Sequence, residues 1–233
     1  SNLQFLLMLC AFIRAVDLYA DLLRMSAACA GNDQRLGGCE APPPIISIFL
    51  GNHLTGILNH IAEGGSPNKV AREQMDIGVE AIPSVTKDET DRNRTSPFAF
   101  TGNKFEFRMV GSSQSLAYSE VVLDTILADS FDAFATRLEG AQDKQEEIRH
   151  IIADTMRQHG RVIYNGNNYS EDWVREAQRR GLPVLRTSVE TFHTLTDPKN
   201  IELFDRYRVF SPKETAARYL SLIHISEPTR LLS

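Results

Sequence analysis

The stretch NRTSPFAFTGNKFEFR, residues 93–108, decides the fold class, because its end alternates between apolar and charged side chains. Successive side chains of a β-strand point to opposite faces of a sheet. Phe105 and Phe107 are therefore expected to face a core. The charged residues that alternate with them are expected to share the other face, namely Lys104, Glu106 and Arg108. The pattern predicts a half-buried strand whose second face is polar.

The polar face of this strand allows two interpretations. Lys104 and Arg108 flank Glu106, and a surface ladder of ion pairs of this kind contributes little to stability. Alternatively, the two cations keep Glu106 ionised, so that it can hold a metal ion or a cationic group. The strand by itself does not decide between a structural and a functional role.

Working outward, the order of helix and strand patterns predicts an α+β fold, with a mainly antiparallel sheet covered by helices and a helical C-terminal half. Ser119 and Ser170 are expected to cap two of these helices, and SPKE at residues 211–214 predicts a capping box. Residues 45–51 and 78–85 have the pattern of further strands. The expected helices span residues 3–28, 55–63, 119–139, 141–159 and 170–180, with two more starting near residues 197 and 211.

The composition limits the kinds of partner. The chain has 233 residues and a net charge of −5, with 42% apolar and 24% charged residues, which is typical of a soluble globular protein. A negative net charge without a run of basic residues argues against binding to nucleic acid or to an anionic membrane. The three cysteines form no CxxC pair, which favours a reduced, cytoplasmic protein.

A second group of charged residues lies in the glycine- and proline-rich segment at residues 30–44, which contains Arg35 and Glu40. Guanidinium groups bind carboxylates and phosphates with two hydrogen bonds, so Arg35, Arg94 and Arg108 can hold anionic groups. The carboxylates of both groups can hold cations. Together they suit a reaction that joins an anionic acid, a nucleotide phosphate and a metal ion. No GxxxxGK(S/T), GxGxxG or HExxH motif points to another chemistry.

Four stretches of the chain resemble the glutamine synthetases, specifically the type III class. Residues 103–108 are similar to the Glu-x-Arg strand of that family, and residues 93–95 to its Asn-Arg-(Ser/Thr) segment. The segment at residues 30–44 is similar to the family's mobile flap, which carries an Arg and then Glu-Ala-Pro. The four stretches are AVDLYADLLR (residues 15–24), GNDQRLGGCEAPPPIISIFLG (residues 31–51), DRNRTSPFAFTGNKFEFRMVGSSQS (residues 91–115) and VIYNGNNYSEDWVREAQRRGL (residues 162–182).

The resemblance implies a ligase that forms glutamine from glutamate and ammonia. In that reaction ATP, as a substrate, phosphorylates glutamate to γ-glutamyl phosphate, and ammonia displaces the phosphate, with Mg²⁺ or Mn²⁺ as cofactor. Closure of the flap would keep water away from the acyl phosphate. The resemblance further implies that the full-length protein is a cytoplasmic homo-oligomer.

Position by position, the resemblance assigns binding roles to four residues. Arg35 and Arg108 would bind glutamate or its acyl phosphate. Glu106 would be a metal ligand. Lys104 would lie near the nucleotide, where the family has an arginine, and a lysine cannot make the same two-pronged contact.

Two further residues are assigned to the chemistry by the resemblance. Arg94 would contact the transferring phosphate and the nucleotide. Glu40 would close the site, bind ammonium and take its proton, as a correctly placed base can. The chain departs from shorter members of the family after Arg94, where SPFAF contains no cation, and its flap segment is a residue shorter.

The resemblance also divides the chain into parts. Residues 1–139 are expected to form the C-terminal part of a glutamine synthetase catalytic domain, and residues 140–219 a helical C-terminal region. Residues 220–233 change character abruptly and resemble the translated adapter sequence that ends some metagenomic gene predictions, so we expect them to be non-native. The chain opens inside a core helix, which is typical of a fragment. The resemblance implies that the family's further metal ligands precede residue 1, so the fragment alone is expected to be inactive.

Two other functions stay open at this point. A related ligase would join glutamate to an amine other than ammonia, which would need a roomier flap. A non-catalytic binding module would keep the fold without the reaction, although a purely structural role gives no reason to keep these charged residues together.

Overall fold

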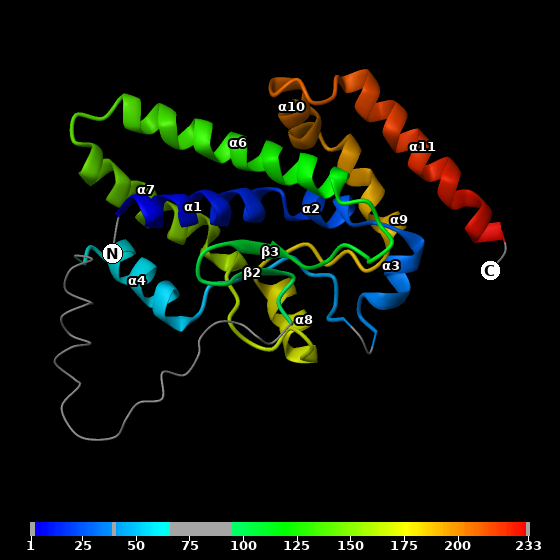
Figure 1. Ribbon diagram of the computed structural model, residues 1–233, viewed down its shortest axis with the longest axis horizontal. Coiled ribbons are helices and arrows are strands. Elements are labelled where there is room, and N and C mark those ends of the chain that lie inside the picture. Colours follow the sequence, from blue (N-terminus) through cyan, green and yellow to red (C-terminus); the bar gives the residue numbers. More distant parts are fainter. Residues whose placement is uncertain (1–2, 39–40, 66–94, 232–233) are drawn as a thin grey trace.

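The computed structural model describes residues 3–38, 41–65 and 95–231, with side chains up to residue 226. Helices form most of the described chain and surround a small sheet, so the predicted α+β class is confirmed (Figure 1). The elements, in chain order, are α1 (Leu3–Leu18), α2 (Ala20–Ser26), α3 (Ala30–Arg35), β1 (Ile48–Phe49), α4 (Asn52–Ala62), β2 (Phe98–Phe100), β3 (Phe105–Phe107), α6 (Ala117–Glu139), α7 (Lys144–His159), η1 (Gly160–Val162), α8 (Glu171–Arg179), α9 (Ser188–Thr191), η2 (Phe192–Thr196), α10 (Pro198–Arg206) and α11 (Pro212–Leu231).

The N-terminal helices form the centre of the molecule. α1 is buried over most of its surface and packs against α6 and α7, which explains why its sequence is apolar on more than one face. The predicted single helix is divided at Tyr19, whose φ of −121° is not helical. The hydrogen bond from the Tyr19 N–H to the Ala15 carbonyl, at 3.1 Å, nevertheless carries the chain from α1 into α2.

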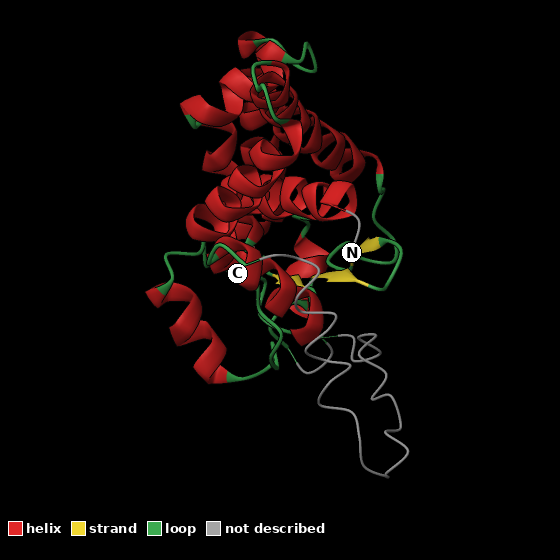
Figure 2. Ribbon diagram, turned by 90° about the vertical axis from the view of Figure 1, so that its left-hand side faces the viewer, coloured by secondary structure: helices red, strands yellow, loops and turns green. Residues whose placement is uncertain are grey.

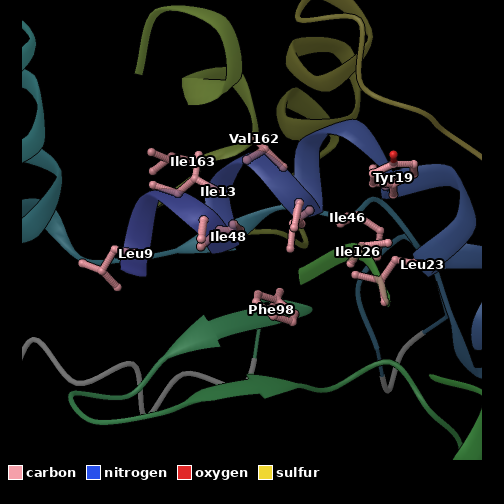
Figure 3. Packing of buried hydrophobic residues seen from close by; sticks show 14 of the residues in the cluster. Leu9, Ile13, Tyr19, Leu23, Ile46, Ile48, Phe98, Ile126, Val162 and Ile163 are labelled. Carbon is pink, nitrogen blue, oxygen red and sulfur yellow. The ribbon is translucent and has the colours of Figure 1, made fainter. Parts of the chain in front are cut away.

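The sheet is mixed, and it lies on one side of α1 (Figure 1). Figure 2 shows its strands beside the main group of helices. β1 pairs with β2 in parallel, and β2 pairs with β3 antiparallel, with Phe98 opposite Phe107 and Phe100 opposite Phe105. Figure 3 shows Phe98 on the side of β2 that faces α1. The ring of Phe105 stacks on that of Phe12 in α1, with 4.2 Å between centroids. The predicted apolar face of residues 105–107 is therefore confirmed, and the charged face of β3 is turned away from α1.

Of the three predicted polar caps, two are confirmed. The Ser170 side chain caps α8, and Asp197 caps α10 ahead of a proline in its first turn. The capping box at α11 is also present, since the Glu214 carboxylate accepts a hydrogen bond from the Ser211 N–H at 2.8 Å. The prediction for Ser119 is wrong, because it lies inside α6 with a buried hydroxyl 3.0 Å from that of Ser26.

Two sequence predictions are not tested by the structure. The strand expected at residues 78–85 lies outside the described residues. α11 continues through residue 220 without a break, so the backbone shows no boundary there. None of the helices in the described ranges combines the length and the apolar character that crossing a membrane would require.

Candidate functional site

An open pocket of about 510 Å³ lies between the end of α3 and the polar end of β3. Its walls come from the segment around α3 and from two neighbouring segments about 60 to 70 residues later in the chain. Its lining residues are Arg35, Leu36, Ala41, Pro42, Pro43, Thr95, Ser96, Pro97, Glu106, Arg108 and Met109. The pocket thus joins the glycine-rich segment to the Glu-x-Arg strand, which the sequence treats as two separate clusters.

The polar face of β3 contains the ion-pair ladder that the alternation predicts. The Lys104 Nζ lies 3.0 Å from Glu106 Oε1, and Arg108 donates from Nε and Nη2 to Glu106 Oε2 at 3.0 and 2.9 Å. These hydrogen bonds, from Lys104 first and then Arg108, hold the pKa of the Glu106 carboxyl below its ordinary value. Glu106 is therefore ionised at neutral pH, and it faces the pocket with its charge balanced by two cations.

Two fixed acceptors hold the Arg35 side chain in place at the pocket. Its Nε donates to Asn32 Oδ1 at 2.9 Å, and its Nη2 donates to the Met109 carbonyl at 2.7 Å. The buried Asn32 amide also donates to the Met109 and Ala27 carbonyls, at 2.8 and 2.9 Å. Asn32 thereby connects the end of α3 to the residue that follows Arg108. Sequence reasoning missed Asn32, because no local pattern distinguishes it from a loop asparagine.

A second anchor of α3 is the buried charge of Arg24, whose side chain is only 1% exposed. Its Nε donates to the Leu185 carbonyl at 3.1 Å, and its Nη2 lies 3.4 Å from Asp33. Asp33 in turn accepts hydrogen bonds from the backbone and hydroxyl of Ser188, at 2.8 and 2.7 Å. Burial lowers the pKa of the Arg24 guanidinium, an effect that the nearby Asp33 opposes. These contacts fix the helix that carries Arg35 to a segment about 150 residues later in the chain.

The turn after Arg35 depends on a glycine. Gly37 has a φ of +81°, a conformation that residues with a side chain rarely adopt. Its N–H donates to the carbonyls of Ala41 and Pro42, at 3.2 and 3.0 Å. These hydrogen bonds bring the chain on the far side of residues 39–40 back beside α3, where it forms a wall of the pocket.

The structure brings some of the predicted site residues together and leaves others undescribed. Arg35, Glu106 and Arg108 line one pocket, whereas Lys104 pairs with Glu106 without lining it. Glu40 and Arg94 lie outside the described residues. Ala41 and Thr95, which directly follow them in the sequence, do line the pocket.

The residues present do not fit a metal ion by themselves. A carboxylate suits Mg²⁺ or Mn²⁺, but both oxygens of Glu106 already contact cationic side chains. Within residues 3–38, 41–65 and 95–231, no three His, Cys, Asp or Glu side chains gather into a possible metal site. A metal bound by Glu106 would therefore need ligands from elsewhere.

The fold and the pocket together define a class: a helix-rich α+β domain with an Arg–Glu–Arg pocket suited to anionic substrates. Comparison with known proteins identifies the family: residues 147–225 match the family model of the glutamine synthetase C-terminal domain, and the relatives described below match nearly the whole chain. The chain belongs to the glutamine synthetase family.

The relatives cover nearly the whole chain. It is 46% identical over 228 residues to the type-3 glutamine synthetase of Dictyostelium discoideum, covering 97% of this chain and 31% of that protein. It is 41% identical over 228 residues to a glutamine synthetase of Butyrivibrio fibrisolvens, covering 96% of this chain and 32% of that protein. A glutamine synthetase of Bacteroides fragilis is 37% identical over 225 residues, with 94% and 31% covered. The chain thus spans about a third of the length of the curated relatives it matches.

Proposed function

We propose that this chain forms part of an ATP-dependent ligase that makes glutamine from glutamate and ammonia in the cytoplasm. The observation that carries the proposal is the single pocket that Arg35 shares with Glu106 and Arg108. These residues lie in the two segments that resemble the family's flap and its Glu-x-Arg strand. The similarity to three glutamine synthetases supports the same reaction.

The two arginines of the pocket are proposed to bind glutamate and its acyl phosphate. Both substrate and intermediate are anionic, and guanidinium groups hold such groups with directed hydrogen bonds. Arg35 already has its Nε and one Nη bound to fixed acceptors, which orients the guanidinium before a substrate arrives. Preorganised charges of this kind stabilise a transition state without having to rearrange.

The reaction proceeds in two transfers. An oxygen of the glutamate γ-carboxylate attacks the γ-phosphorus of ATP, which releases ADP and leaves γ-glutamyl phosphate. The nitrogen of ammonia then attacks the acyl carbon, phosphate leaves, and the extra proton passes to a base. We propose Glu40 as that base, Arg94 as the cation that contacts the transferring phosphate, and Lys104 as a contact to the nucleotide.

Glu106 is proposed to supply one carboxylate ligand for the Mg²⁺ or Mn²⁺ that organises the ATP phosphates. The lowered pKa of Glu106 suits this role, because a metal binds the ionised carboxylate. The remaining ligands would come from other parts of the full-length protein, which is proposed to be a homo-oligomer.

A chimeric enzyme tests the proposal. The matching segment of the Dictyostelium type-3 glutamine synthetase is replaced by this chain, and γ-glutamyl hydroxamate formation is measured. We expect an active chimera in which Glu106→Gln lowers the rate by roughly a hundredfold or more, the effect of removing one preorganised catalytic charge. Glu139→Gln, at an exposed position on α6, is the matched control and should change little. A Glu106→Gln chimera with full activity would contradict the assignment of Glu106 to the active site.

A further inference from the structure

A second open pocket, of about 620 Å³, lies beside α4 and shares no residue with the first. Its walls are formed by residues of α4, the end of α7, η1, the loop between η1 and α8, and Arg180 at the C-terminal end of α8. In Figure 1, α3, beside the first pocket, lies to the right of the strands, and α4, beside the second, lies to the left. No step of the proposed reaction uses it.

Two arginines give this pocket its chemical character. Arg161 and Arg180 both line it, together with the amide side chains of Asn52, Asn59 and Asn165. No Asp or Glu is among its lining residues. The pocket wall is therefore rich in hydrogen-bond donors. The nearby carboxylates of Asp17 and Glu176 lie outside the lining and are paired with Arg161 and Arg180.

Each guanidinium keeps donor capacity after its structural contacts. Arg161 uses Nε for the buried Asp17 at 2.7 Å and Nη1 for the Arg180 and Gly181 carbonyls. Arg180 uses Nε for Glu176 at 2.7 Å and Nη1 for the Arg161 and Ile163 carbonyls. In the part of the chain that the structure describes, neither Nη2 group has a hydrogen-bond partner. Two oriented N–H₂ groups therefore remain for a ligand.

The pocket is held in shape without a ligand. Asn165 Oδ1 accepts from the backbone of Leu50 and Gly51 at 3.1 and 3.0 Å, and its amide donates to Thr55 at 3.0 Å. These contacts fix the loop against the start of α4. Donors that are fixed in advance lose little entropy when a ligand binds.

The position of Arg180 is fixed by aromatic rings. Tyr164 stacks on the buried Trp173 with 3.7 Å between ring centroids. The Arg180 guanidinium carbon lies 5.8 and 5.6 Å from these two centroids, within the range of a cation–π interaction.

We infer that this second pocket binds a small oxyanion, with phosphate or carboxylate groups facing Arg161 and Arg180. Guanidinium and amide donors recognise both kinds of group in the same way. The site is separate from the proposed ligase pocket, so its occupancy can be tested independently of the reaction.

The test uses amide NMR shifts of Asn165 and Arg180 in the full chain, titrated with inorganic phosphate or with citrate at constant ionic strength. Saturable shifts with either probe are expected, and the probe that binds more tightly identifies the favoured group. Asn59→Asp adds a negative charge at an exposed position on the pocket wall and should weaken binding about fivefold. Gln145→Glu adds the same charge near the other end of α7 and should leave the affinity unchanged.

Arg108→Gln separates this site from the ligase pocket. It removes a cation from the first pocket and should leave the shifts at Asn165 and Arg180 intact. The inference is overturned if neither probe binds, if Gln145→Glu weakens binding as much as Asn59→Asp, or if Arg108→Gln abolishes the shifts.

Discussion

At the scale of single residues, the two interpretations of Glu106 turn out to be compatible. Lys104 and Arg108 form the ion-pair ladder expected of a surface strand, and the same contacts keep the carboxylate charged at the edge of a pocket. The ladder therefore serves the site by keeping Glu106 ionised to a lower pH than an unpaired carboxyl, although exposed ion pairs of this kind add little to stability.

Removing either cation should raise the pKa of Glu106. In Lys104→Gln and in Arg108→Gln, the ionised carboxylate loses a positively charged hydrogen-bond donor, so its pKa moves up toward the ordinary value. A carbon-detected NMR titration of the Glu106 carboxyl measures this, with Lys144→Gln on α7 as the control. Because the folded-state pKa is the lower one, any stabilisation is present above the unfolded pKa of about 4.3 and is lost as the pH falls through the folded value. An unchanged pKa of Glu106 in both variants would contradict the role of the ion-pair ladder.

Arg24 and Asn32 show what local sequence reasoning cannot reach. Each is buried, and each satisfies partners that come from distant parts of the chain: Leu185 for Arg24 and Met109 for Asn32. Local patterns report periodicity and capping, both of which depend on near neighbours. A buried polar residue whose partners are 77 or 161 residues away leaves no such signal.

At the scale of elements, the strand alternation predicted the two faces of β3 because one of them is buried. The aromatic stack of Phe105 on Phe12 fixes β3 to α1, which in turn sets the direction of its charged face. Ser119 marks the limit of such reasoning. Its position near the start of α6 suggested a cap, but tertiary packing against Ser26 determined its role instead.

Phe105→Ala tests whether this stack holds the strand in place. The ring is half-buried, so we expect the free energy of unfolding to fall by about 2 kcal/mol, less than for a fully buried phenylalanine. Phe131→Ala, at a side chain that is 39% exposed on α6, should cost no more than about 0.5 kcal/mol. Urea unfolding followed by circular dichroism measures both. Equal losses would mean that β3 is not anchored through Phe105.

At the scale of the whole molecule, the fold brings together clusters that the sequence separates. The segment around Arg35 and the strand around Glu106 lie about 70 residues apart, yet they wall one pocket, because Asn32 and Arg35 both donate to the Met109 carbonyl. The family resemblance anticipated this convergence, whereas spacing alone did not. The roles of Glu40 and Arg94 stay predictions, because both lie outside the described residues.

The isolated chain should not make γ-glutamyl hydroxamate, even with saturating ATP and Mg²⁺ or Mn²⁺. Glu106 is a single carboxylate with both oxygens paired, and the described residues contain no group of three metal-binding side chains. Without a bound metal, the negative charges of ATP and glutamate oppose phosphoryl transfer. The Dictyostelium type-3 enzyme is the positive control, and the chimera that contains this chain should regain activity under the same conditions. Hydroxamate formation above background by the isolated chain would show instead that these residues complete a metal site on their own.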